Sequence, residues 1–211
     1  VEILRENNII PSMGNSIANA EEVTLAIDAG AQRCTLLYNC MNSIHQRQIG
    51  LATTALVDDR ITVELIFDGF HIHPQMIDLA CRSKSKEQVI AVSAGTIGTG
   101  LKDGEYNFSG RQISIENQHC RLADGTIAGS MITQEQAWKN VLSFTHYKPQ
   151  NAISCFTANP ARNLGLQDRG FLDPGLSADI VILNEQHEVQ LTLVNGEIAY
   201  IKDPEIIKRN E

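Results

Sequence analysis

The sequence lacks an excess of positive charge, and it lacks long apolar runs. Its 17 Lys and Arg residues are outnumbered by 25 Asp and Glu residues, which gives a formal net charge of −8 over 211 residues. A general nucleic-acid binder needs a basic face, and no run of Lys or Arg supplies one, so nucleic acid is excluded as a partner. The longest apolar runs are short and interrupted by charge. We therefore expect no membrane-spanning segment, no membrane partner and no signal peptide.

The five cysteines show no C-x-x-C spacing. Their number is odd and they are scattered along the chain. This distribution argues against a disulfide framework and against a zinc site built from thiolates. We therefore expect a reducing, cytoplasmic environment, in which Cys81 and Cys155 are small core residues.

Over its first two thirds the sequence alternates short apolar strands with amphipathic helices. Residues 1–7 read as the end of a helix. Strands are predicted over 9–13, 33–38, 61–67 and 89–93. A helix is predicted over 20–29, with Asn19 as its N-cap and Gly30 as its stop, and another over 74–83, with Pro74 in the first turn. Alternation at this spacing predicts an α/β fold with parallel strands.

The pattern changes after about residue 104. Short polar strands around Gly110 predict a β excursion over 106–122 instead of another strand–helix unit. Two helices are predicted next, over 133–147 and 149–163. Strands are then predicted over 178–183, 188–194 and 197–201, with Asn195-Gly196 as a hairpin turn. A charged tail over 202–211 completes the chain.

Eight short strings follow one another in a fixed order along nearly the whole chain. They are GNS at 14–16, TLLYNCM at 35–41, HQRQIG at 45–50, DGFHIHP at 68–74, LADGTIAGS at 122–130, NPAR at 159–162, AD at 178–179 and VNG at 194–196. One such string says little, but their common order and spacing are specific. On these strings the chain resembles the C-terminal half of an N-acetylglucosamine-6-phosphate deacetylase, within the amidohydrolase superfamily.

The resemblance implies a partial TIM-like (β/α) barrel with parallel strands and a portion of a small C-terminal β domain. The barrel portion is expected over 1–174, with the β excursion near 104–122, and strands of a small β-sandwich domain over 175–201. It also implies an active site at the C-terminal ends of the strands. There a divalent metal such as zinc or iron polarises the acetamide and activates water, and an aspartate serves as general base and acid. The substrate-binding residues implied are Asn39, Cys40, Arg47, Asp68, His71, Ile127, Ala128 and Gly129.

Four departures from the family pattern bear on function. Asn15 and Leu36 stand where the family has metal-binding histidines, and their separation of 21 positions matches the family spacing. Ala94 or Ser93 stands at the place of the catalytic aspartate. The glutamate ligand of the family belongs to an upstream strand outside this sequence. We therefore predict no catalytic residue and no metal ligand among these positions, and a divalent metal that is absent or weakly bound.

Function follows from these retained and lost residues. We predict a deacetylase-like protein of amino-sugar metabolism that is catalytically impaired and retains binding of an amino-sugar phosphate. One alternative is an active carbohydrate deacetylase completed by upstream residues or by another subunit. Another is a non-catalytic structural or assembly subunit. Because a complete barrel takes about 250 residues, we also expect either a homo-oligomer that covers the open sheet edges or a fragment of a longer chain.

Simpler interpretations remain open for several residues. Arg47 can be an ordinary surface arginine. His71 and His73 can form a metal pair on one face of an extended segment, or they can be polar loop residues. The segment 95–100 is rich in glycine but lacks the G-x-G-x-x-G order, so it predicts a mobile loop. The remaining histidines are interpreted as isolated surface or edge residues: His45, His119, His146 and His187.

Overall fold

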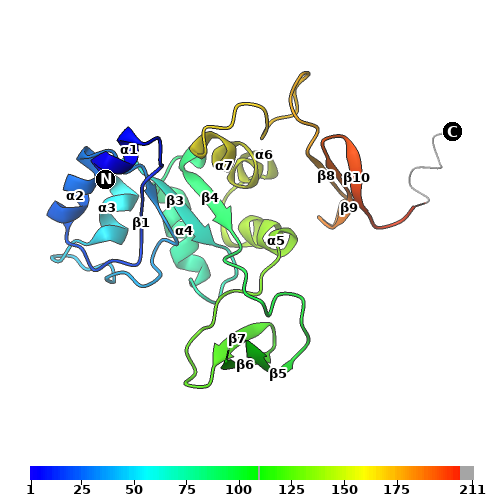
Figure 1. The fold of residues 1–211 in the computed structure, drawn as a ribbon, viewed down its shortest axis with the longest axis horizontal. Helices are drawn as coiled ribbons and strands as arrows, with labels where there is room; N and C mark the ends of the chain where they lie inside the picture. Colours follow the sequence, from blue (N-terminus) through cyan, green and yellow to red (C-terminus); the bar gives the residue numbers. More distant parts are fainter. Residues whose placement is uncertain (109, 205–211) are drawn as a thin grey trace.

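A four-stranded parallel sheet forms the centre of the structure, a computed structural model that describes residues 1–108 and 110–204 (Figure 1). Its strands follow the chain order across the sheet, and each neighbouring pair is parallel. They are β1 (Ser12–Met13), β2 (Arg33–Cys34), β3 (Thr62–Ile66) and β4 (Val89–Val92). The predicted parallel strands are confirmed, although β1 and β2 are shorter than expected.

Helices connect the parallel strands and continue after them. Helix α1 (Glu2–Glu6) precedes β1, and the connecting helices are α2 (Ala20–Asp28), α3 (Leu51–Val57), α4 (Pro74–Ser83) and η1 (Lys86–Gln88). The later ones are α5 (Gln134–Phe144), α6 (Pro149–Ala152), η2 (Ile153–Phe156) and α7 (Ala158–Asn163). Asn19 caps α2 through a capping box with Glu22, as the sequence predicts for position 19. The helix over 74–83 is confirmed with its proline in the first turn.

One face of the sheet packs on these helices and forms the main core. Val63 and Leu65 of β3 alternate along the strand and are fully buried, together with Ala55 of α3, Ile77 of α4 and Val141 of α5. Cys34, Cys81 and Cys155 belong to the same core, and burial raises the pKa of each thiol to about 12. The expectation that Cys81 and Cys155 are core residues is confirmed.

Two antiparallel sheets lie apart from the parallel sheet (Figure 1). The predicted excursion is a meander of β5 (Gly104–Phe108), β6 (Arg111–Glu116) and β7 (His119–Leu122). The C-terminal sheet contains β8 (Ile180–Leu183), β9 (Val189–Val194) and β10 (Glu197–Ile201). Asn195 and Gly196, both with positive φ, form its predicted hairpin turn. Residues 205–211 of the predicted tail lie outside the described part of the chain.

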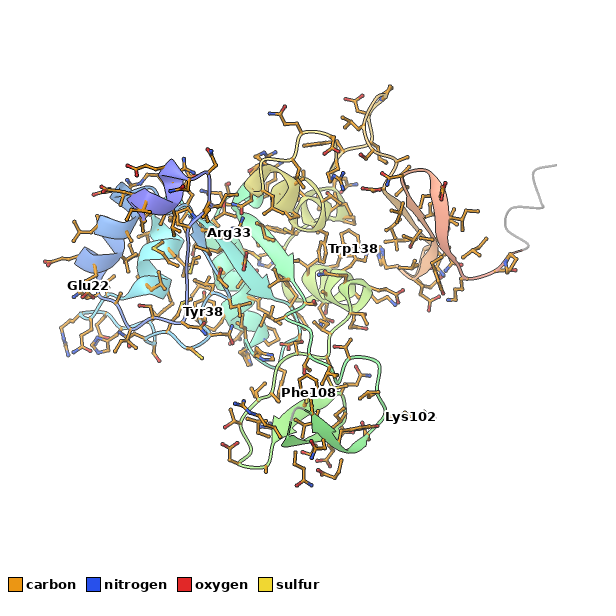
Figure 2. All side chains as sticks on the ribbon, in the orientation of Figure 1. Glu22, Arg33, Tyr38, Lys102, Phe108 and Trp138 are labelled. Carbon is orange, nitrogen blue, oxygen red and sulfur yellow. The ribbon has the colours of Figure 1, made fainter. Side chains whose placement is uncertain are left out.

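The C-terminal sheet contacts the helices through one of its two faces. The side chain of Trp138 on α5 lies between the helices and this sheet (Figure 2). Its ring contacts Phe156 of η2 at 5.8 Å and His187 of the β8–β9 turn at 5.7 Å, measured between centroids. His187, predicted to be isolated, therefore takes part in this junction. The carboxylate of Glu135 accepts a hydrogen bond from the backbone N–H of Val189 at 2.9 Å.

The opposite face of the C-terminal sheet is aliphatic and uncovered. The strand register places six residues on it, and none of them is buried. They are Ile180, Ile182, Leu191, Leu193, Ile198 and Ile201. We call this set the aliphatic face.

Within residues 1–108 and 110–204, no helix has both the length and the apolar character needed to cross a bilayer.

Candidate functional site

Four positions share one place at the end of the parallel sheet. Each lies two residues after the last residue of its strand: Asn15 after β1, Leu36 after β2, Asp68 after β3 and Ala94 after β4. Because parallel strands end at the same edge, these four residues lie along the C-terminal rim of the sheet. Two of them offer only aliphatic atoms and one offers an amide. Asp68 is the ionisable residue of the four.

The main chain at this rim is strained. Asn15, Leu36 and Ala94 have φ angles of +48°, +47° and +45°. Asparagine tolerates this left-handed conformation, but for a leucine or an alanine it costs roughly 1–2 kcal/mol. Neighbouring hydrogen bonds hold two of these residues in place: the N–H of Asn39 donates to the Leu36 carbonyl at 2.9 Å, and the N–H of Ser130 donates to the Ala94 carbonyl at 3.2 Å. Strain of this kind is concentrated at functional sites.

The donor atoms at the rim do not fit a divalent cation. Zinc requires three or four nitrogen, sulfur or oxygen ligands at about 2.0–2.3 Å. Leu36 and Ala94 offer no such atom, and Asn15 offers one amide oxygen. Over the described ranges 1–108 and 110–204, no group of three or more His, Cys, Asp and Glu residues is arranged to hold a metal. Nδ1 of His73 caps α4 by accepting the N–H of Gln75, and a metal pair of His71 and His73 stays an open alternative.

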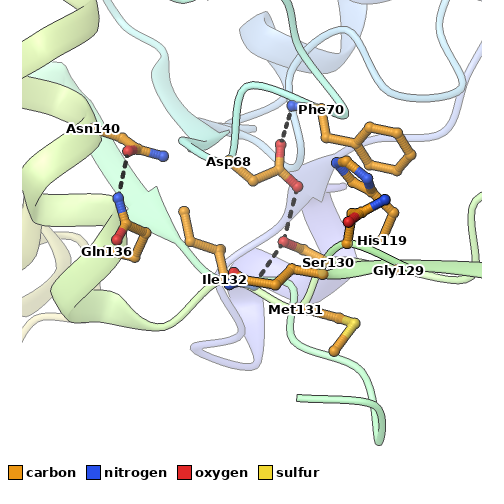
Figure 3. Close-up of a pocket in the computed structure, with 11 residues that line it drawn as sticks. Asp68, Phe70, His119, Gly129, Ser130, Met131, Ile132, Gln136 and Asn140 are labelled. Atoms are coloured by element: carbon orange, nitrogen blue, oxygen red, sulfur yellow. Dashed lines mark hydrogen bonds between the residues drawn. The ribbon is translucent and has the colours of Figure 1, made fainter. Parts of the chain in front are cut away.

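Asp68 is the centre of a hydrogen-bond network. Its Oδ1 accepts the backbone N–H groups of Phe70 and His71, both at 2.9 Å. Its Oδ2 accepts a hydrogen bond from Oγ of Ser130 at 2.8 Å (Figure 3). The same Oδ2 lies 2.6 Å from Nδ1 of His71. The side chains of Asp68 and His71 are 9% and 11% exposed, so water competes little for these bonds. The network fixes the loop that follows β3.

The Asp68 carboxyl group is ionised. Burial raises its pKa, but hydrogen bonds from His71, Phe70 and Ser130 outweigh that effect and hold the pKa below its usual value of 3.8. A carboxylate is an acceptor only, so Nδ1 of His71 must carry the proton and donate it. The other ring nitrogen of His71, Nε2, has no hydrogen-bond partner among the described residues.

Two cavities lie beside this network. The histidine cavity, about 220 Å³, is lined by His71 and His73 together with Tyr38, Met41, Asn42 and Ser43. The amide cavity, about 130 Å³, is lined by Asp68 and Ser130 together with Asn117, Gln118, Gln136 and Asn140 (Figure 3). Its amides are partly fixed, since Gln136 donates to Asn140 at 2.8 Å and Asn140 donates to the Phe67 carbonyl at 2.7 Å.

The structure brings some of the predicted binding residues together. Asp68, His71 and Gly129 lie at the network or at one of the two cavities. Asn39 holds the turn after β2, because its amide nitrogen donates to the carbonyls of Leu36 and Leu37. Cys40 is the exposed cysteine beside that turn, with a φ of +53°.

Other predicted binding residues lie away from the cavities. Arg47 is exposed and lines neither cavity. Ile127 and Ala128 bind the segment before Ser130 to the meander: Ile127 bridges to Arg121, and the N–H of Ala128 donates to the Cys120 carbonyl at 2.8 Å. The binding roles of these three residues stay predictions.

The structure also shows two site residues, Ser130 and His119, whose contacts are not predicted from the sequence. Ser130 was visible at the end of the LADGTIAGS string, but only the fold places it on Asp68. His119 was interpreted as an isolated residue, and this is wrong. Its ring stacks on that of Phe70, with centroids 3.9 Å apart and planes 32° apart. No local pattern joins residues 49 positions apart, so this contact has no signal in the sequence.

Comparison with known proteins agrees with this geometry. The model of the amidohydrolase family matches residues 6–199. The N-acetylglucosamine-6-phosphate deacetylase of Bacillus subtilis (strain 168) is 36% identical over 199 residues, which are 94% of this chain and 50% of that protein. The chain therefore spans about half the length of this relative.

Solved structures of relatives show the same fold. The N-acetylglucosamine-6-phosphate deacetylase of Thermotoga maritima matches with a TM-score of 0.90 and 32% identity, over 95% of this chain and 55% of that one. A structure from Mycobacterium smegmatis, an aspartate-to-alanine variant in complex with N-acetyl-D-glucosamine-6-phosphate, matches with a TM-score of 0.86 and 31% identity, over 93% of this chain and 53% of that one. These matches confirm the predicted partial TIM-like barrel with a small β portion.

Proposed function

This chain belongs to the amidohydrolase family, and from that membership we propose that it is a deacetylase-like protein of amino-sugar metabolism that binds an amino-sugar phosphate without hydrolysing it. The proposal rests on a contrast between two sets of residues at the C-terminal rim of the sheet, one that fits ligand binding and one that lacks metal-binding groups. The Asp68–His71–Ser130 network is complete. Positions 15, 36 and 94 meanwhile hold an amide, an isobutyl group and a methyl group.

The binding part of the proposal rests on the histidine cavity. Asp68 fixes His71 with Nδ1 protonated, so Nε2 of the neutral ring is an acceptor for the ammonium or a hydroxyl group of an amino-sugar phosphate in the cavity that His71 lines. The turn at Asn39 and Cys40 lies next to Met41 and Asn42, which line the same cavity. A hydrogen bond between a protein group and a charged ligand group contributes roughly 1.5–3 kcal/mol. Arg47 is proposed as a further phosphate contact if its loop closes over the ligand.

The non-hydrolytic part of the proposal rests on missing chemistry. Amide hydrolysis needs an activated water and a group that moves protons, and the rim supplies neither a ligand set for a metal nor a carboxylate at position 94. The structure of the Mycobacterium smegmatis relative contains substrate although an aspartate has been replaced by alanine. In that relative, binding does not require the replaced aspartate, and the proposal extends this separation to the present chain.

Binding is tested by calorimetric titration with glucosamine 6-phosphate. We expect heat of binding for the unaltered protein, and at least a tenfold weaker affinity for His71→Ala, because a hydrogen bond to a charged group is lost. The matched control is His146→Ala, which removes an exposed histidine that pairs with Asp78 at 3.5 Å and lines neither cavity. Absence of heat for the unaltered protein at millimolar ligand would contradict the proposal.

We also propose that the aliphatic face is covered by a second copy of the chain or by further residues of a longer polypeptide. Six Ile and Leu side chains on one uncovered sheet face form the kind of exposed apolar patch that marks an interaction site. This face also supports the alternative of an assembly subunit, which would bind no sugar phosphate.

Light scattering coupled to size exclusion tests the assembly. We expect a mass above that of the monomer for the unaltered chain and a monomer for Ile182→Glu, because a charge on the aliphatic face cannot be buried in an interface without a partner. Val57→Glu is the control, since Val57 is 72% exposed on α3, far from that face. A stable, soluble monomer at all concentrations would exclude assembly through a second copy.

A further inference from the structure

The β5–β7 meander packs against the loop that follows β3 and carries His71. Phe70 directly precedes His71, and the two rings meet edge to face with centroids 5.8 Å apart and planes at 88°. Two further neighbours of the Phe70 ring come from β7. His119 stacks on it at 3.9 Å, and the guanidinium carbon of Arg121 lies 5.0 Å from its centroid.

The geometry of β7 explains why His119 and Arg121 both contact Phe70. Residues 119 and 121 are two apart on a strand, so both side chains project from the same face. That face is directed at Phe70, because both side chains contact its ring. Arg121 is itself held in place, since its Nη1 donates to the Gly125 carbonyl at 2.8 Å. A stacked ring on one side and a cation beside it are favourable partners for a phenyl group.

The backbone of the loop that carries His71 is flexible at Gly69, so side-chain contacts are needed to fix its conformation. Gly69, with a φ of +74°, lies between Asp68 and Phe70, and glycine is the most permissive residue of the backbone. Asp68 holds the inner end of the loop through its hydrogen bonds. At the outer end, the ring of Phe70 contacts the rings of His71 and His119 and the guanidinium of Arg121. Both anchors act on His71, one through its Nδ1 and one through its ring edge.

From this arrangement we propose that His119 and Arg121 are positioning residues, which hold Phe70 and thereby aim His71 into the histidine cavity for an amino-sugar phosphate. The meander thus sets the affinity of a site to which it contributes no ligand contact. This inference rests on the proposed function for its ligand, but the position of His71 is measurable without any ligand.

Removing the contacts of His119 and Arg121 with Phe70 is expected to make the His71 loop less ordered and so to lower the affinity for the sugar phosphate. If the loop adopts its binding geometry only a fraction of the time, the dissociation constant rises by the inverse of that fraction. Removing both contacts to Phe70, in His119→Ala/Arg121→Ala, is expected to weaken binding of glucosamine 6-phosphate about tenfold in calorimetry. The pair His119→Phe/Arg121→Lys keeps a stacked ring and a cation, and is expected to restore affinity to within about twofold of the unaltered protein.

A matched control separates positioning from general damage to the meander. Arg111→Ala removes one exposed arginine from β6 and leaves the Phe70 contacts intact. It is expected to bind like the unaltered protein. Equal weakening in this control and in the double alanine variant would overturn the inference, as would unchanged affinity in the double alanine variant.

Nuclear magnetic resonance of the His71 ring nitrogens, without ligand, provides the second readout. A His71 ring whose Nδ1 is protonated and bonded to Asp68 has a characteristic pair of nitrogen chemical shifts. We expect the double alanine variant to change these chemical shifts and the Phe/Lys variant to keep them. Unchanged His71 shifts in the double alanine variant would overturn the inference even if the unaltered protein bound no sugar phosphate. Absence of binding with changed His71 shifts would overturn only the proposed function.

Discussion

No acetate is expected from N-acetylglucosamine 6-phosphate when the purified chain is incubated with it, whether or not zinc or iron(II) is supplied. A bound metal lowers the pKa of water from about 15.7 to about 7. At about 1.36 kcal/mol per unit, the missing activation is on the order of 12 kcal/mol. The absent general base removes a further factor of about 10²–10⁴. No arrangement of Asn15, Leu36 and Ala94 compensates for terms of this size.

Acetate release measured by a coupled assay tests this expectation, with a full-length relative as positive control. Metal content measured by mass spectrometry after purification is the accompanying observation, and less than stoichiometric divalent metal is expected. Acetate release that rises in proportion to protein concentration and stops on addition of a chelator would refute the expectation. Such a result would favour the alternative of an active deacetylase completed by another subunit.

The second large effect is expected for Asp68→Ala. The change removes the acceptor for two backbone N–H groups, the Ser130 hydroxyl and the His71 ring. Breaking a buried charged network by deleting one partner costs several kcal/mol, and we expect a loss of about 3 kcal/mol in the free energy of unfolding. Binding of glucosamine 6-phosphate should fall more than a hundredfold, because His71 loses its protonation pattern and its orientation together.

Urea unfolding measures the loss of stability, and calorimetry measures the loss of affinity. The pH dependence of stability shows how much of the loss comes from the charge of Asp68. The folded-state pKa of Asp68 lies below 3.8, so its stabilisation is present above about pH 4 and is lost as the pH falls through the folded value. The difference between Asp68→Ala and the unaltered protein should therefore shrink below about pH 4. Asp124→Ala is the control: Asp124 is exposed and accepts one N–H, from Thr126. A midpoint for Asp68→Ala as high as that of Asp124→Ala would show that the network does not stabilise the loop.

Elements with strong local signals were predicted from the sequence, and elements whose shape depends on distant contacts were not. The Asn19 cap, Pro74 at a helix start and the Asn195-Gly196 turn are local signals, and all three are where the sequence places them. Helix α3 was missed because Gly50 gives no side-chain cap and because the helix has little polar face. Five of its seven residues are buried.

Two predicted elements are shorter or interrupted for identifiable reasons. The strand expected over 33–38 ends at Cys34, because Leu36 and Tyr38 take positive φ angles. The helix expected over 149–163 is divided into α6, η2 and α7, with a break at Thr157. Pro160 lies in the first turn of α7, where its missing N–H is tolerated, and a continuous helix would place its ring against the carbonyl of residue 156.

The site was predictable where chemistry is carried by one residue and unpredictable where it depends on assembly. The identities of Leu36 and Asn15 alone are the basis for the predicted loss of metal chemistry. The contacts of Ser130 with Asp68 and of His119 with Phe70 join residues about 50–60 positions apart. Their chemistry exists only once the meander and the strand ends are folded together.

The left-handed residues at the strand ends have a consequence for protein design. Asn15, Leu36 and Ala94 keep torsion angles that histidine and aspartate tolerate better than leucine or alanine do. Histidine or aspartate grafted at these positions would therefore lower the backbone strain that leucine and alanine impose there. These three positions are therefore suitable starting points for the design of an artificial metal site.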